Sequence, residues 1–119
     1  MRPTLVTGLT GSANHEVTTK WSTDHAFHPV LATPSMIGLI EWVCFGVTKD
    51  HLDEGEVTVG IHVCVSHESS VLVGEHIGIA AELVEIDGRK LTFDVVVTGP
   101  RGRVSQGTHK RAVLSPPPG

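Results

Sequence analysis

The sequence predicts an α+β fold in which an antiparallel sheet wraps around one long helix. Residues 33–47 are apolar at nearly every position and open with Thr33 and Pro34, which favours a helix buried on most sides. Residues 57–65 alternate valine and isoleucine with smaller or more polar residues, the period of a β-strand. The remaining sequence keeps this strand character to residue 114, with turn residues between its segments. One helix followed by several strands is therefore the expected order.

Before the helix, the chain is less regular. Residues 1–14 are rich in Thr, Gly, Ser and Asn, and we expect them to be irregular. Residues 16–21 have the β-branched character of a strand. Residues 25–29 should form a loop, because the residue before a proline avoids the helical region. We expect Thr33 to cap the helix and Pro34 to occupy its first position, where no N–H is required.

After the helix, four strands are expected. Asp87-Gly88 is a favoured tight hairpin turn between the second and third of them. Residues 115–119 should form a loose, extended tail. The strands are expected at residues 57–65, 75–86, 90–98 and 103–114.

A one-sided curved sheet cannot cover an apolar helix all round. The exposed remainder of the helix and the open sheet edges point to pairing with a second copy of the chain. This order of elements matches the hotdog fold, a long helix wrapped by an antiparallel sheet and usually dimeric. We therefore expect one hotdog domain over residues 1–119, in a homodimer or a higher oligomer.

Composition excludes several classes of protein. The chain has 119 residues and a formal net charge of −4, so no basic excess exists to neutralise nucleic-acid phosphates. Residues 33–47 are too few to span a bilayer, and the amino end has no apolar run of signal-peptide length. Cys44 and Cys64 form no CxxC pair and lie in apolar segments, which favours two small buried hydrophobes in a reducing compartment. We expect a cytoplasmic protein that acts on neither membranes nor nucleic acids.

Basic residues are concentrated late in the sequence. Such a cluster could hold a small polyanionic ligand, or it could be a solvated strand edge that charge protects from aggregation. The residues are Arg101, Arg103, Lys110 and Arg111.

Three polar side chains interrupt the apolar patterns. Glu41 lies in the least polar stretch of the chain, where the surroundings oppose ionisation unless a partner compensates. Thr33 precedes it by about two helical turns. His67 continues the apolar row of residues 57–65, so it should lie near the core or a pocket. Thr33 could be only an N-cap and His67 only a hydrogen-bonded pocket residue. Glu41 is the hardest to explain by packing alone.

Three separated segments then resemble one family. Residues 32–42 are similar to the Ala-Thr…Gly-Leu-x-Glu-Trp helix of the fluoroacetyl-CoA-thioesterase-like group of hotdog thioesterases. Residues 60–67 are similar to its strand ending Cys-Val-(Ser/Thr)-His, and residues 107–113 to its Gly-Thr-His-x-Arg strand. The resemblance covers most of residues 15–114 in the same order and spacing. It implies an acyl-CoA thioester hydrolase that needs no metal or cofactor, with coenzyme A as part of its substrate.

The resemblance also assigns the site. It implies that Thr33, Glu41 and His67 are catalytic and that Gly60 and Arg111 line the thioester and pantetheine site. The chemistry suits these residue types: a carboxylate can attack or activate water, an imidazole can shuttle the proton, and Thr33 can orient the reactants. The unpaired N–H groups at the helix start could stabilise the oxyanion, and the late basic residues could meet the phosphates.

Phe27, the one aromatic in the loop before the helix, is a further expected substrate contact. Related enzymes are richer in Phe there and tend to have Gly and an aromatic where this chain has Pro34-Ser35. We therefore expect an acyl pocket of a different shape. The resemblance implies thioesterase chemistry, and these departures leave fluoroacyl selectivity open.

Other functions remain open to test. The first alternative is a catalytically silent hotdog module that binds acyl-CoA or a related acyl ligand. A hotdog hydratase is a weaker one, because Asp24-His25 lacks the rest of the pattern that dehydratases carry. A zinc site built on His62 and Cys64 would lack further ligands at recognisable spacing. We expect surface or structural roles for six of the histidines: His25, His28, His51, His62, His76 and His109.

Overall fold

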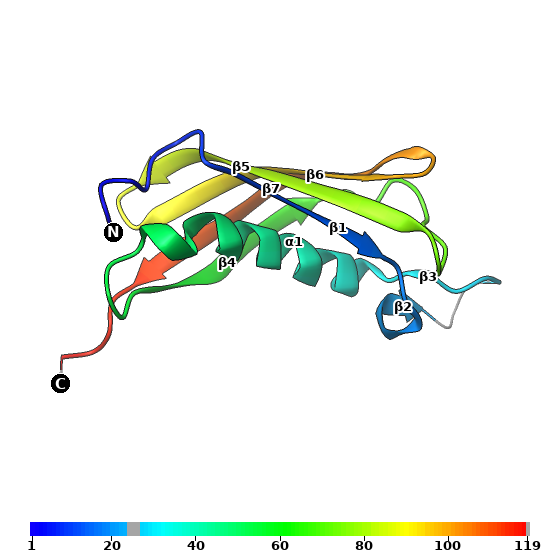
Figure 1. Ribbon diagram of the computed structural model, residues 1–119, viewed down its shortest axis with the longest axis horizontal. Coiled ribbons are helices and arrows are strands. Elements are labelled where there is room, and N and C mark those ends of the chain that lie inside the picture. The colour runs from blue at the N-terminus through cyan, green and yellow to red at the C-terminus, as the bar shows by residue number, and fades with distance from the viewer. Residues whose placement is uncertain (24–26, 119) are drawn as a thin grey trace.

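A single long helix lies against one face of a five-stranded antiparallel sheet (Figure 1). The computed structural model describes residues 1–23 and 27–118. The helix is α1 (Thr33–Thr48), followed by the short 3-10 turn η2 (Lys49–His51). The sheet contains β1 (Thr10–Glu16), β4 (Val57–Val65), β5 (His76–Asp87), β6 (Lys90–Gly99) and β7 (Gly102–Leu114). The turn η1 (Thr19–Trp21) and a ribbon of β2 (Ser22–Thr23) with β3 (Val30–Leu31) precede the helix.

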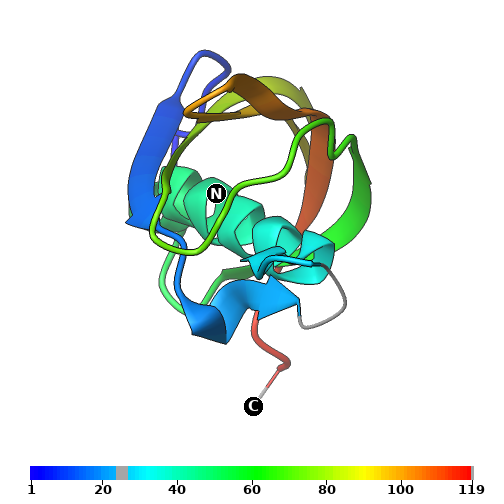
Figure 2. The ribbon, with the colours of Figure 1, turned by 90° about the vertical axis from the view of Figure 1, so that its right-hand side faces the viewer.

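The sheet curls around the helix. Its strand order is β1-β5-β6-β7-β4, so β1 and β4 form the two edges. Seen from the end, the two edge strands lie on opposite sides of α1 and the sheet arches between them (Figure 2). This architecture confirms the predicted hotdog fold. Within the described residues, no helix is both long enough and apolar enough to cross a membrane.

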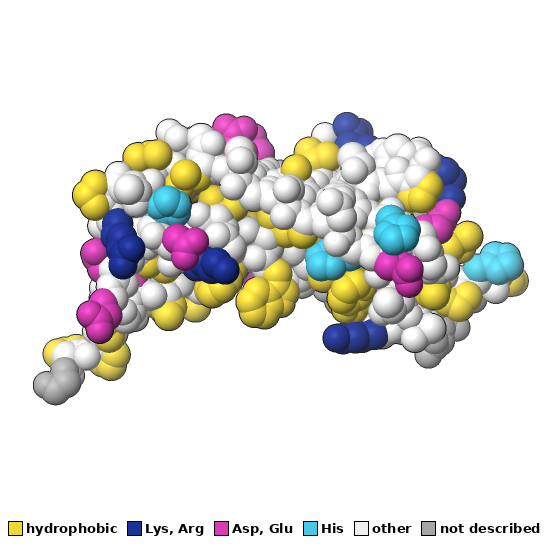
Figure 3. Space-filling view, in the orientation of Figure 1, with side chains coloured by type: hydrophobic (Ala, Val, Ile, Leu, Met, Phe, Trp, Pro, Cys, Tyr) yellow, Lys and Arg dark blue, Asp and Glu magenta, His cyan; other side chains and the backbone are white. Residues whose placement is uncertain are grey.

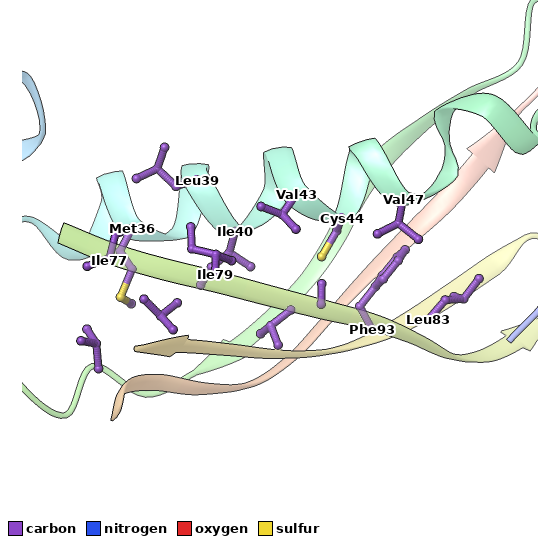
Figure 4. Packing of buried hydrophobic residues seen from close by; sticks show 14 of the residues in the cluster. Met36, Leu39, Ile40, Val43, Cys44, Val47, Ile77, Ile79, Leu83 and Phe93 are labelled. Carbon is purple, nitrogen blue, oxygen red and sulfur yellow. The ribbon is translucent and has the colours of Figure 1, made fainter. Parts of the chain in front are cut away.

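One side of α1 forms the core. Met36, Ile40 and Cys44 point from the helix toward Ile79 and Phe93 of the sheet, and all five are buried (Figure 4). Burying a side chain of this size contributes roughly 1.5–3 kcal/mol, so this row holds the helix in the sheet. The opposite side of the helix is open. The sequence predicted that the helix is buried on most sides, but the described chain buries only one side of it.

A β-bulge in β4 overturns the single apolar face expected for residues 57–65. Gly60 pairs with Arg111 and His62 pairs with Lys110, so Ile61 is an extra residue and the side-chain alternation is reset there. Thr58, not its valine neighbours, faces the core. Four large apolar side chains of this edge strand are 37–50% exposed: Val57, Val59, Ile61 and Val63.

The first strand begins earlier than expected. β1 starts at Thr10, inside the stretch predicted to be irregular, and residues 17–21 form a loop and the turn η1. Small residues explain the difference: a Cβ on Gly11 would lie 2.7 Å from Val47 Cγ2, so the missing side chain lets β1 approach α1 closely. Strand propensity alone does not capture this tertiary requirement.

The β5–β6 hairpin turn also shifts. Asp87 pairs with Lys90, so the turn consists of Gly88 and Arg89 rather than Asp87 and Gly88. Gly88 has φ of 60°, a conformation that favours glycine. Residues 115–118 form no regular structure.

The two cysteines differ in environment. Cys44 is buried in the core, as expected, and burial raises the pKa of its thiol to about 12. Cys64 is exposed, contrary to expectation, because β4 is an edge strand with no neighbour on its outer side.

Candidate functional site

Polar side chains gather at two places along α1. One cluster lies at the amino end of the helix, around Thr33, and the other lies near its middle, around Glu41. The two residues are separated by about 12 Å along the helix axis, at 1.5 Å per residue. Among the described residues, Glu41 makes no hydrogen bond or ion pair with Thr33 or His67.

The first cluster pairs Thr33 with His67. Thr33 Oγ1 lies 2.7 Å from His67 Nδ1. The helix begins at Thr33 with Ala32 as its N-cap residue, so the prediction that Thr33 caps the helix is wrong by one position. Its hydroxyl therefore bonds the imidazole instead of a backbone N–H. His67 lies just beyond the end of β4, and the pair borders a groove of about 580 Å³ that Val30 and Pro34 also line.

The second cluster brings Glu41 to Gly60 and Arg111. Glu41 Oε2 lies 3.6 Å from Arg111 Nη1. The Glu41 side chain is 40% exposed, so it points to the open side of the helix and not into the core as its apolar sequence context indicated. A Cβ on Gly60 would lie only 2.7 Å from the same carboxylate oxygen. Glycine at position 60 therefore allows the carboxylate to approach β4.

Arg111 is held by hydrogen bonds from every nitrogen of its guanidinium. Nε donates to Thr58 Oγ1 at 2.9 Å and Nη2 donates to the Thr58 carbonyl at 3.0 Å. Nη1 lies 3.1 Å from His109 Nε2. Burial lowers the pKa of Arg111, while the charge of Glu41 opposes this effect. The second cluster is thus a buried cation held against a half-exposed carboxylate.

A cavity of about 370 Å³ opens beside Glu41. Arg111 and Thr58 supply its polar wall, and Trp42 and Phe45 supply an aromatic wall. The two aromatic rings meet edge to face, with centroids 5.5 Å apart, and the Arg111 guanidinium lies 6.0 Å from the Phe45 centroid. Trp42 is 71% exposed. Hydrophobic side chains gather along the edge of the molecule where α1 lies (Figure 3).

The remaining predicted residues lie elsewhere. Phe27 is fully exposed, so one subunit does not bring it to either cluster. Arg101 donates to Glu75 and Arg103 donates to Glu68, so these two arginines are neutralised by surface carboxylates rather than gathered for phosphates. Asp24 and His25 lie outside the described residues. No group of three or more His, Cys, Asp or Glu side chains in the described ranges is arranged to hold a metal ion.

The structure adds two polar residues that the sequence analysis did not place in the site. Thr58 and His109 hold Arg111 from β4 and β7. His109 and Arg111 are two residues apart on one strand, so they share a face of the sheet. That period-2 spacing was the available signal for His109.

Fold and site together define a hotdog protein with an acidic centre on its long helix. Comparison with known proteins gives the family. The profile of the family described as fluoroacetyl-CoA-specific thioesterase matches residues 14–116, and the chain belongs to this family. The curated fluoroacetyl-CoA thioesterase of Streptantibioticus cattleyicolor is 35% identical over 88 residues, which cover 74% of this chain and 63% of that protein. The matched region thus spans less than two thirds of that relative.

Solved structures agree with the family. The fluoroacetyl-CoA thioesterase FlK superposes with a TM-score of 0.86 at 28% identity, covering 92% of this chain and 88% of that chain. A variant of FlK in complex with fluoroacetate and CoA gives a TM-score of 0.85 at 28% identity, covering 92% and 95%. A thioesterase-superfamily protein of Thermus thermophilus has a TM-score of 0.87 at 24% identity, covering 97% and 87%, and shows the shared fold.

Proposed function

We propose that this protein hydrolyses the thioester of a small acyl-CoA, releasing a free acid and coenzyme A. One observation carries the proposal: the Glu41 carboxylate lies at a mainly apolar cavity, next to Gly60 of β4 and the buried Arg111. A carboxylate in such a place can act on a carbonyl that approaches along β4. The relatives' names point to fluoroacetyl-CoA as one substrate to test. We expect no cofactor, and the cytoplasm as its location.

The roles of the residues follow from their chemistry. Glu41 acts on the thioester carbonyl, as nucleophile or as the base that activates water, and Gly60 lets this carboxylate lie close to β4, where the thioester approaches. If Glu41 acts as base, it takes a proton from a water molecule whose oxygen bonds to the carbonyl carbon; if Glu41 attacks directly, water then hydrolyses the acyl anhydride formed on it. In both routes the carbon–sulfur bond breaks, and the departing thiolate takes up a proton that the water ultimately replaces. His67, with Thr33 bonded to its ring, supplies that proton.

We further propose that a second copy completes each site. Within one subunit, Glu41 and the Thr33–His67 pair belong to separate clusters. β4 is an open edge on which four large apolar side chains are 37–50% exposed, as suits a strand that pairs with another copy. Antiparallel pairing of β4 with its symmetry mate would bring the end of the strand that carries His67 toward the partner's Gly60 and Glu41. The fully exposed Phe27 would then be available to the partner's cavity.

Hydrolysis tests the function directly. The purified protein should release thiol from acetyl-, fluoroacetyl- or other short acyl-CoAs, and Glu41→Gln should lower kcat by at least about 100-fold. The side chain is half exposed, so this variant should fold normally. Saturable acyl-CoA binding without turnover would favour the silent binding module. Equal rates for wild type and Glu41→Gln would remove Glu41 from the mechanism.

Mixing two inactive variants tests the shared site. Glu41→Ala and His67→Ala subunits, unfolded and refolded together, form heterodimers in which one of the two composite sites is intact. Random assortment should restore about a quarter of wild-type activity. If each subunit contained a whole site, the mixture would stay inactive. Each variant refolded alone is the control.

A further inference from the structure

His109 is the most deeply enclosed polar side chain near Glu41. It is fully buried, and its ring lies against Phe93 with centroids 6.5 Å apart. Both ring nitrogens have partners: Nδ1 lies 2.8 Å from the His62 carbonyl, and Nε2 lies 3.1 Å from Arg111 Nη1. A histidine on a strand next to a catalytic cluster could be simple core filling. The two hydrogen-bond partners of the ring indicate a positioning role in addition.

The partners fix the proton on one nitrogen. A guanidinium can only donate hydrogen bonds, so Nε2 must accept from Arg111. A carbonyl can only accept, so Nδ1 must carry the hydrogen and donate to His62. His109 is therefore the neutral Nδ1–H tautomer. A proton added at Nε2 would remove the acceptor and place two cations in contact. Burial, which lowers the pKa of His109, acts in the same direction.

We infer that His109 is a positioning residue that holds Arg111 Nη1 against the Glu41 carboxylate. This inference rests on the proposed function of Glu41. Thr58 binds Nε and Nη2, which anchors one edge of the guanidinium. Nη1 is the nitrogen nearest Glu41, and His109 is its hydrogen-bond acceptor. The bulge in β4 contributes as well, because the carbonyl that orients His109 belongs to His62, the first residue paired after Ile61.

Two conservative variants separate the two hydrogen bonds. His109→Gln keeps an amide oxygen able to reach Arg111, whereas His109→Asn keeps an amide N–H near the His62 carbonyl but is too short to reach Arg111. Loss of a hydrogen bond that orients a catalytic group typically costs 10–100-fold. We expect kcat to fall roughly 10–100-fold in His109→Asn and within about 5-fold in His109→Gln, with KM changed less than kcat. A purely structural histidine would give equal effects in both variants.

Nitrogen NMR of the wild-type protein provides an assay that needs no turnover. At neutral pH the His109 ring should show a protonated Nδ1 and an unprotonated Nε2, and the Nε2 signal should shift in Arg111→Lys. The opposite tautomer, or an Nε2 signal indifferent to Arg111→Lys, would overturn the inference even if both His109 variants fail to fold. So would equal kcat values in Asn, Gln and wild type. An inactive wild type would instead count against the proposed hydrolysis.

Discussion

The two clusters along α1 are built in opposite ways. Around Glu41, the arginine side chain is 7% exposed and donates to Thr58 and His109 from three nitrogens. Around Thr33, a single hydrogen bond joins two side chains at the surface. Both clusters contain a group that the proposed reaction uses. Only the Glu41 cluster is held by buried groups of the chain.

The difference shows which half of the proposed site a single chain holds in place by itself. Buried hydrogen bonds fix Arg111 before any ligand arrives, so the Glu41 half is preorganised. The Thr33–His67 half lies where the ribbon, the helix start and the end of β4 meet, and it stays open to a partner or substrate. Removal of the buried groups that bond to Arg111 should therefore affect folding, whereas mutations in the Thr33–His67 half should mainly affect activity.

Removing Arg111 should have the largest effect. Arg111→Ala leaves Thr58 and His109 without their partner and Glu41 without its nearby cation. We expect the free energy of unfolding to fall by about 2–4 kcal/mol and kcat to fall at least about 100-fold. Denaturant unfolding and acyl-CoA hydrolysis measure the two losses. An unchanged midpoint would show that the buried network contributes no stability.

Thr33 should separate activity from stability. In Thr33→Ala the His67 ring loses its partner, so kcat should fall about 10–100-fold, while stability should change by no more than about 0.5 kcal/mol at this exposed position. Thr33→Ser keeps the hydroxyl and should recover most of the activity. A large drop in melting temperature for Thr33→Ala would contradict the contrast between the two halves.

Gly38 should control the space beside Glu41. It lines the cavity, and a Cβ there would meet nothing within 4 Å. Gly38→Leu should therefore fill the cavity without a clash in the subunit and raise KM for acyl-CoAs about 10-fold. Gly46 on the same helix also has nothing within 4 Å but does not line the cavity, so Gly46→Leu is the matched control. Equal KM values in the two variants would place the substrate elsewhere.

The smallest expected effect is a pH dependence of stability. The pKa of His109 is lowered by folding, so below the ordinary value of 6.5 the unfolded chain binds a proton that the folded chain rejects. Its stabilising contribution is complete above that pH and decreases as the pH falls. The charged or titratable groups that influence it are Arg111, Glu41 and His62.

Unfolding curves at pH 7.5 and 5.5 measure the effect. Wild type should lose about 1 kcal/mol more than His109→Gln over this range. The strongly paired Glu56 and Glu75, whose pKa values are about 2, stay ionised throughout it. Identical pH dependence in the two proteins would show that His109 does not titrate as a buried neutral base.

Much of the fold could be predicted from sequence because it depends on local patterns. The apolar run of α1 and the alternation of apolar and polar residues in β5, β6 and β7 can be recognised from residues that are neighbours in the sequence. The start of β1 was predicted too late, because the close approach of Gly11 to the helix exists only in the folded structure. The prediction of which β4 side chains face the core was wrong, because no pattern in the neighbouring sequence indicates the extra residue at Ile61.

The candidate site divides in the same way. Thr33, Glu41, His67, Gly60 and Arg111 could be proposed from motifs. The sequence could not show that Glu41 lies next to Arg111 while Thr33 lies next to His67. These pairings depend on how the helix and the strands are placed relative to one another in the fold. Their catalytic roles remain predictions.

The two thiols give the chain a built-in labelling scheme. The Cys44 thiol is buried and has a pKa of about 12, so it should not react with alkylating reagents. The exposed Cys64 should react, giving one labelled thiol per chain. Any assay that follows liberated coenzyme A with a thiol-reactive dye must subtract the signal from this one protein thiol per chain. The reaction of Cys64 can also be used to detect association. Because Cys64 lies on the strand proposed to join two copies, its rate of modification should fall as the protein concentration rises.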